Sequence, residues 1–145
     1  MAVKNYKDYA DKLNKIYNKN NLNKIDSELK TYNCFGFVSY VLGWTNKLFW
    51  LEDDFTHSLE YHTNIIQENE ELKEGDILIL YYKTKAIHSA ILVNKNSQDK
   101  IINEYLFIHK KGRQELISDT LDDILEIYDE LYDRIEFRRM NNNNK

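Results

Sequence analysis

The stretch Thr31-Tyr-Asn-Cys-Phe-Gly-Phe-Val-Ser-Tyr-Val-Leu42 contains the only cysteine of the chain, Cys34. A short polar lead-in that includes Asn33 stops at this cysteine. Apolar residues then recur at the spacing of one helix face, at Phe35, Val38, Val41 and Leu42. The pattern predicts a buried helix with Cys34 in its first turn, and the small Gly36 and Ser39 would let another segment pack closely against it.

A cysteine at a helix start is a candidate nucleophile. Unpaired backbone N–H groups and the positive end of the helix dipole favour a thiolate at such a position. The structural alternative is a cysteine that only packs, because free cysteines are among the most buried residues. The rest of the chain has to decide between these two interpretations of Cys34.

Composition predicts one folded domain, over residues 1–140, followed by a short disordered tail, 141–145. The formal net charge of -4 argues against a nucleic-acid partner, since such proteins usually present a basic face. Residues 1–10 are polar and lack the apolar core of a secretory signal, and no apolar run approaches the length needed to cross a membrane. We therefore expect no membrane partner, and a protein that is cytoplasmic or exported without a cleaved signal peptide.

Periodicity along the chain predicts an α+β fold. Apolar residues at helical spacing predict further helices over residues 3–17, 55–66 and 119–128. Short apolar or alternating runs predict strands over residues 77–82, 86–93, 100–109, 114–118 and 134–139. The order is helices first, then an antiparallel meander, one helix and a closing strand.

A cysteine nucleophile needs a base, and His88 is the strongest candidate because it starts a predicted strand beside small residues. The alternative is a core histidine that is merely hydrogen-bonded. A third polar group would orient the ring of the base. Alternation along the next predicted strand places Asn103 and His109 on one face and Glu104 on the other. Either face could look toward His88.

Both tryptophans, Trp44 and Trp50, follow the predicted Cys34 helix. They either anchor a loop in the core or form one wall of a substrate cleft. Tyr32 lies two residues before the cysteine, where its side chain could line the pocket that receives an oxyanion. These three residues are the candidate substrate-binding set.

Four segments resemble the papain-like NlpC family of bacterial cell-wall peptidases. Asn33-Cys-Phe-Gly-Phe-Val-Ser-Tyr40 resembles the nucleophile segment, in which a polar residue precedes the cysteine of a helix. Glu74-Gly-Asp-Ile-Leu-Ile-Leu80 is similar to the Pro-Gly-Asp strand of that family, with Glu74 in place of proline. Ile87-His-Ser-Ala-Ile-Leu-Val93 resembles its His-Val-Gly-Ile strand, and Ile108-His109 resembles its later Ile-His pair.

A narrower likeness covers nearly all of the chain after residue 31. Tyr32-Asn-Cys34, the tryptophan pair, His88-Ser-Ala and His109-Lys-Lys-Gly112 resemble a poorly characterised group of bacterial papain-like proteins. That group carries Tyr-Asn-Cys, His-Ala-Ala and Ser-Lys-x-Gly motifs and ends in a helix and a strand with two arginines. In this chain His109 replaces the serine of the third motif.

The resemblance implies a papain-like cysteine hydrolase that cleaves an amide bond without a metal or organic cofactor. Cys34 would be the nucleophile, His88 the base and His109 the third residue. Glu104 is the second choice for that third role, because the hairpin between His88 and His109 is longer than in the cell-wall enzymes. The implied substrate is a peptidoglycan stem peptide or a protein.

Two alternatives remain open at this point. One is an exported toxin or effector that deamidates or cleaves a protein of a target cell, with an immunity protein as its partner. The other is a catalytically inactive binding domain that keeps the fold.

Overall fold

The computed structural model describes residues 4–5, 31–95, 101–110 and 116–141. The predicted helix over residues 3–17 lies outside these ranges, except that Lys4–Asn5 form a short strand, β1, instead of helix. Residues 142–145 of the predicted tail also lie outside them. No helix in the described ranges has both the length and the apolar character needed to cross a membrane.

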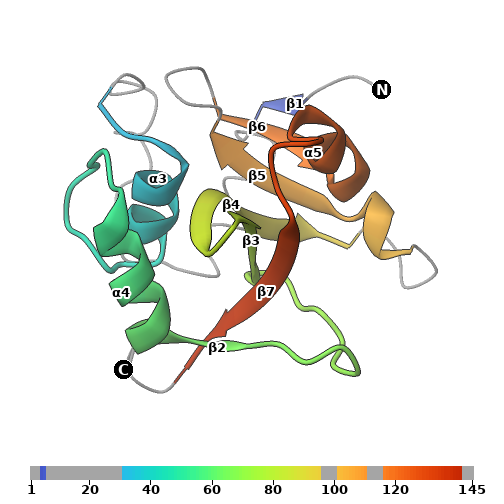
Figure 1. The fold of residues 1–145 in the computed structure, drawn as a ribbon, viewed down its shortest axis with the longest axis horizontal. Helices are drawn as coiled ribbons and strands as arrows, with labels where there is room; N and C mark the ends of the chain where they lie inside the picture. Colours follow the sequence, from blue (N-terminus) through green and yellow to red (C-terminus); the bar gives the residue numbers. More distant parts are fainter. Residues whose placement is uncertain (1–3, 6–30, 96–100, 111–115, 142–145) are drawn as a thin grey trace.

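The described residues form a mixed α+β structure built on an antiparallel sheet (Figure 1). The sheet has seven strands in the order β1-β6-β5-β4-β3-β7-β2. The remaining strands are β2 (Thr63–Ile65), β3 (Ile77–Tyr82), β4 (Lys85–Asn94), β5 (Leu106–Lys110), β6 (Leu116–Thr120) and β7 (Arg134–Met140). The predicted fold class is therefore confirmed at the level of α+β.

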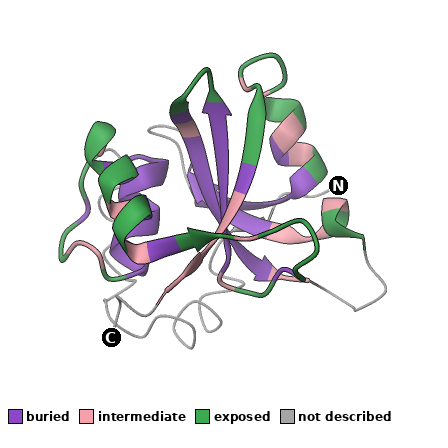
Figure 2. Ribbon diagram, turned by 60° about the horizontal axis from the view of Figure 1, so that its bottom comes forward, coloured by how far each residue is buried: buried purple, intermediate pink, exposed green. Residues whose placement is uncertain are grey.

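Helices cover both faces of the sheet. Helix α3 (Cys34–Val41) and helix α4 (Asp53–His62) share one core with the inward side chains of the central strands, among them Ile79 and Ile91. Helix α5 (Leu121–Ile127) packs on the opposite face, against Leu80, Leu92 and Phe107. Figure 2 shows the central strands buried along most of their length. Burial on both faces explains why β3 and the second half of β4, residues 90–93, are continuously apolar in sequence.

Several predicted elements are confirmed within a residue or two. The strand over 77–82 is β3, the strand over 86–93 lies within β4, and the closing strand over 134–139 is β7. Helix α3 begins at Cys34, as the polar lead-in predicted. Helix α5 begins at Leu121, and the Thr120 hydroxyl caps it by accepting a hydrogen bond from the Asp123 N–H at 3.1 Å.

Other predicted boundaries are wrong. The helix predicted over 55–66 ends at His62, because Thr63–Ile65 pair with β7 as the edge strand β2. The strand predicted over 100–109 is divided into a short 3₁₀ helix, η2 (Ile102–Glu104), and β5. Strand β6 extends beyond the predicted 114–118 to Thr120, so Asp119 belongs to a strand and not to a helix.

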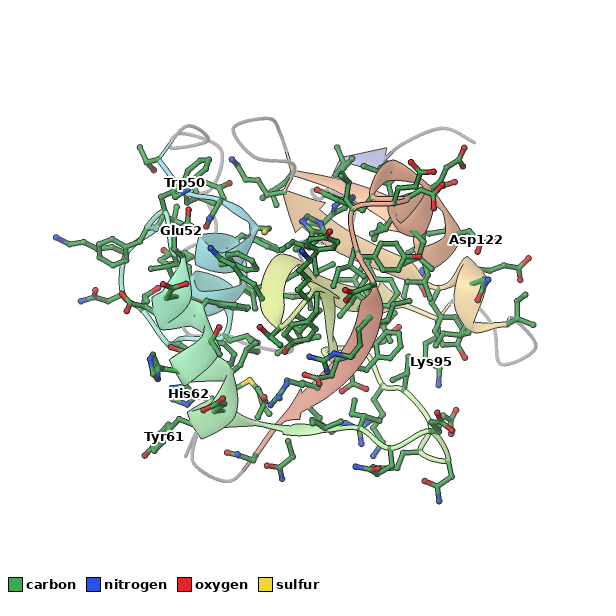
Figure 3. The ribbon with its side chains drawn as sticks, viewed as in Figure 1. Trp50, Glu52, Tyr61, His62, Lys95 and Asp122 are labelled. Carbon is green, nitrogen blue, oxygen red and sulfur yellow. The ribbon has the colours of Figure 1, made fainter. Side chains whose placement is uncertain are left out.

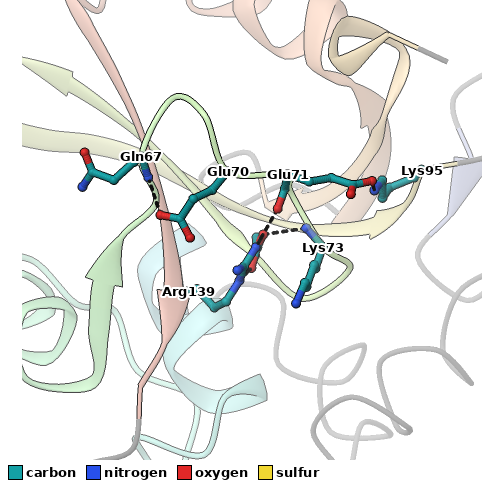
Figure 4. A network of polar contacts seen from close by, with 7 residues as sticks. Gln67, Glu70, Glu71, Lys73, Lys95 and Arg139 are labelled. Carbon is teal, nitrogen blue, oxygen red and sulfur yellow. Dashed lines mark hydrogen bonds and ion pairs between the residues drawn. The ribbon is translucent and has the colours of Figure 1, made fainter. Parts of the chain in front are cut away.

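A polar network fixes the connection between β2 and β3 (Figure 4). The Arg139 guanidinium donates to both carboxylate oxygens of Asp76, each at 2.8 Å, and to the Glu71 carbonyl at 2.9 Å. Asp76 also accepts from the Lys73 N–H at 2.7 Å. A two-pronged arginine–carboxylate pair is geometrically specific. It ties the turn before β3 to the end of β7.

Gly36 in helix α3 has the backbone of the following loop against it. A Cβ built at this position would lie 1.7 Å from the Phe49 carbonyl oxygen. We expect Gly36→Ala to destabilise the protein by about 3 kcal/mol, the upper end of overpacking costs, because the obstacle is backbone and cannot rotate away. Urea unfolding followed by tryptophan fluorescence measures this change.

Ser39→Ala is the matched control for this substitution in the same helix. Ser39 is fully buried, and among the described residues its hydroxyl has no hydrogen-bond partner. Replacing an unsatisfied hydroxyl with hydrogen should leave stability unchanged or raise it by about 1 kcal/mol. A Gly36→Ala variant as stable as Ser39→Ala would show that the loop does not pack on Gly36 as described.

Candidate active site

Asn33 fixes the start of helix α3. Its side-chain Oδ1 accepts hydrogen bonds from the Gly36 N–H at 3.0 Å and the Leu51 N–H at 3.2 Å. Its Nδ2 donates to the Leu51 carbonyl at 2.7 Å. One side chain therefore caps the helix and ties it to the loop that precedes α4. This is the physical reason for the polar residue immediately before Cys34.

Cys34 is 6% exposed and lies where helix α3 meets strand β4. The Ser89 hydroxyl of β4 donates to the Cys34 carbonyl oxygen at 3.2 Å. Burial raises the pKa of the Cys34 thiol to about 11, and hydrogen bonds from Ser89 and from the backbone at Phe35 offset only part of this rise. The expectation of a resting thiolate is therefore wrong, because desolvation of the charged form outweighs the helix start.

Three polar side chains form a buried hydrogen-bonded chain beside this cysteine. His88 Nε2 on β4 lies 2.8 Å from His109 Nδ1 on β5. His109 Nε2 lies 2.7 Å from Asp119 Oδ2 on β6. His109 was predicted as the third residue, and the structure places it in contact with the predicted base. Asp119 was predicted only as the first residue of the helix over 119–128, and the structure places it behind His109.

The Asp119 carboxylate, at the end of this hydrogen-bonded series of side chains, determines both histidine tautomers when the rings are neutral. Asp119 accepts, so the proton of His109 is on Nε2 and its Nδ1 is an acceptor. His88 must then donate from Nε2, which leaves the lone pair of the ring on Nδ1. This assignment follows from the hydrogen-bond network. It makes His88 Nδ1 the atom that can take a proton.

The His88 ring is held neutral by burial and is packed against the ring of Tyr128. Burial, with a smaller effect of His109, puts its pKa well below the ordinary 6.5. The ring of Tyr128, the residue after α5, stacks on it with centroids 4.3 Å apart. Burial also raises the pKa of Tyr128, and the negative charges of an ionised Cys34 and of Asp119 act in the same direction. Tyr128 therefore keeps its proton and shields His88 from water.

A pocket of ≈ 370 Å³ opens onto Cys34 and His88. Trp50, Glu52 and Tyr128 also line it. Trp50 and Glu52 lie on the same side of the molecule, well apart from Asp122 (Figure 3), and the Trp50 indole N–H donates to Glu52 Oε1 at 3.3 Å. Among the described residues no hydrogen bond joins the Cys34 sulfur to His88. The two share the pocket without forming a resting ion pair.

Three predicted site residues lie elsewhere. Tyr32 is fully buried, with the Lys110 ammonium 4.5 Å from its ring centroid, and it is not one of the pocket-lining residues. Trp44 stacks on His62 at 5.0 Å and packs against the core that contains α3, so it anchors the loop. Glu104 lies exposed in η2, while the side-chain hydrogen bond of His88 is with His109.

Sequence reasoning missed the roles of Asp119, Tyr128 and Lys110. Asp119 was hidden because the helix was predicted to begin two residues too early, at a position that belongs to β6. Once β5 and β6 are paired with Phe107 opposite Asp119, alternation places His109 and Asp119 on the same face. Lys110 carried no signal, since a lysine in a polar motif is usually exposed.

Comparison with protein-family models, curated proteins and solved structures gave no match for this chain. In the described ranges no three histidine, cysteine or acidic side chains converge as a metal site would require.

Proposed function

We propose that this chain is a papain-like cysteine hydrolase that cleaves an amide bond. Cys34 is the nucleophile, His88 is the base, and His109 orients His88. The cysteine helix packed on an antiparallel sheet supports the papain-like assignment. The observation that carries the proposal is the buried series of hydrogen bonds from His88 through His109 to Asp119. Its His88 end lies in the same pocket as the only cysteine of the sequence.

The reaction begins with a neutral thiol and a neutral imidazole. As the Cys34 sulfur attacks the amide carbonyl, the thiol proton passes to His88 Nδ1, and the imidazolium is stabilised through His109 by the Asp119 carboxylate. The tetrahedral oxyanion is stabilised by backbone N–H groups at the start of α3. His88 then gives its proton to the leaving amine, and a thioester remains on Cys34. Water attacks this thioester with His88 again as base, which releases the acid and regenerates the thiol.

The test of this proposal is turnover of defined amides by the full chain. The protein is incubated with muropeptides and, separately, with a protein extract, and new termini or glutamine-to-glutamate changes are read by mass spectrometry. Products that appear with the wild type and disappear with Cys34→Ala support the proposal. Cleavage that persists in Cys34→Ala overturns it. The protein-extract arm also detects the deamidating or cleaving activity expected of an exported effector.

The competing candidate is a catalytically inactive binding domain with the same fold. It is favoured by the raised thiol pKa and by the lack, within the described residues, of a hydrogen bond between Cys34 and His88. Catalytic hydrogen bonds often tighten only when substrate binds. Iodoacetamide alkylation separates the two candidates, because Cys34 is the only thiol. A rate that His88→Gln leaves unchanged would favour the binding domain.

Trp50 is the predicted cleft residue that does line the pocket. We expect Trp50→Ala to raise KM for a cleaved amide about tenfold, with a smaller effect on kcat, because an exposed aromatic wall contributes binding area. Phe49→Ala is the matched control. Both side chains are 43% exposed, but only Trp50 is among the pocket-lining residues. Equal effects of the two substitutions would contradict a role for Trp50 in substrate binding.

A further inference from the structure

Lys110 is a fully buried lysine at the end of β5. Its Nζ donates to the Tyr32 carbonyl oxygen at 2.8 Å and lies over the Tyr32 ring. Removing an ammonium group from water costs several kcal/mol in proteins. A charged side chain kept in this position indicates that the positive charge has a local use.

The position of Tyr32 in the chain indicates what the positive charge of Lys110 does. Tyr32 is two residues before Cys34, so the Lys110 hydrogen bond holds the segment that leads into helix α3. Strand β5 also packs directly against α3. Lys110 and His109 are adjacent on β5, and alternation turns their side chains to opposite faces. One strand thus approaches the cysteine with a histidine relay on one face and a cation on the other.

The pKa of Lys110 is consistent with an ammonium group that acts on Cys34. Burial lowers the pKa of Lys110 to about 8, and a negative charge on Cys34, present when the thiol ionises, acts in the opposite direction. The ammonium group is therefore mostly protonated near neutral pH and close enough to interact with an ionised Cys34. An opposite charge nearby favours ionisation of a thiol whose burial otherwise opposes it.

We infer that Lys110 positions the Cys34 segment through the Tyr32 carbonyl and supplies the buried positive charge that stabilises the Cys34 thiolate. This inference rests on the proposed function, in which that thiolate attacks the substrate. Lys110 is a positioning and charge-stabilising residue and does not itself touch the substrate pocket.

The test is the pH dependence of iodoacetamide alkylation between pH 5 and 11, which reports on Cys34 alone. In the wild type the ion pair of thiolate and ammonium reacts, so the rate should rise with pH, level off near pH 8 as Lys110 loses its proton, and rise again as the bare thiolate forms. Titration of His88 would produce a separate step at acid pH. Within the described part of the chain, the other titratable groups that contact Lys110 or share the pocket of Cys34 are Tyr32, Glu52, Lys85, His88 and Tyr128.

Two variants remove the charge in different ways. Lys110→Met fills the space, and Lys110→Gln keeps a donor for the Tyr32 carbonyl. Both should lose the step near pH 8 and react about tenfold more slowly at pH 7, equivalent to one pKa unit. Lys110→Arg should keep the rate at pH 7 and extend the first rise beyond pH 8. Thermal melts establish that each variant is folded.

The outcomes separate this inference from the proposed function. A wild-type profile without a step near pH 8 overturns the role of Lys110, whether or not the variants fold. A step that persists in folded Lys110→Met and Lys110→Gln also overturns it. Amide turnover that depends on Cys34 would leave the proposed function standing in either case. If no amide is turned over but the alkylation step near pH 8 depends on Lys110, the proposed hydrolase function is rejected and the inferred ion pair between Lys110 and Cys34 is kept.

Discussion

Asp119→Asn is expected to lower kcat/KM for a cleaved amide by about 10²-fold or more, with little loss of stability. The substitution preserves the shape of the side chain that contacts His109 at 2.7 Å. It removes the charge that stabilises the imidazolium. When the amide donates to His109 Nε2, it also reverses both tautomers and places a proton on His88 Nδ1. A base in the wrong tautomer cannot accept the thiol proton, and comparable disruption of a catalytic triad costs about 10⁴-fold.

Asp122→Asn is the control for this measurement. Asp122 lies on the first turn of α5, three residues from Asp119, and accepts a hydrogen bond from the Asn103 side chain outside the pocket. Its substitution should leave kcat/KM within about twofold, because surface substitutions away from a site have small effects. If Asp119→Asn behaved like Asp122→Asn, the carboxylate would only be structural and the relay would end at His109.

The second large effect is a loss of stability in acid that comes from His88. The pKa of this ring is lowered well below 6.5 in the folded protein, whereas the unfolded chain protonates it normally. Below pH 6.5 the unfolded state therefore binds more protons, so stability falls as pH falls. The slope is about 1.4 kcal/mol per pH unit, or about 2 kcal/mol between pH 6.5 and 5. Urea unfolding at a series of pH values measures it.

His88→Gln should remove this slope, because glutamine does not titrate and can still donate to His109. His57→Gln, on the exposed surface of α4, is the control for loss of a histidine as such. It should retain the acid slope of the wild type. A slope that is unchanged in His88→Gln would mean that His88 is not held neutral by burial in the folded state.

Local pattern was sufficient for the elements that carry the predicted residues. The helix that begins at Cys34 follows from a capping Asn33 and an apolar stripe, both of which act within one or two turns of chain. Strand β3 and most of β4 follow from short apolar runs that can only be buried. The adjacent strands of a meander left Asn103, Glu104 and His109 open as partners of His88, and the family resemblance favoured His109, which is the residue in contact.

Only the tertiary structure decided the rest, since the deciding contacts join residues far apart in sequence. Register placed His109 next to His88 and Asp119 behind it, whereas alternation alone had left both faces of the strand open. Burial reversed the expected state of the residue at the centre of the Thr31–Leu42 stretch. The local sequence pattern alone placed Cys34 at the start of its helix. Desolvation under strand β4 decides its charge, because desolvation depends on what the fold packs around the sulfur.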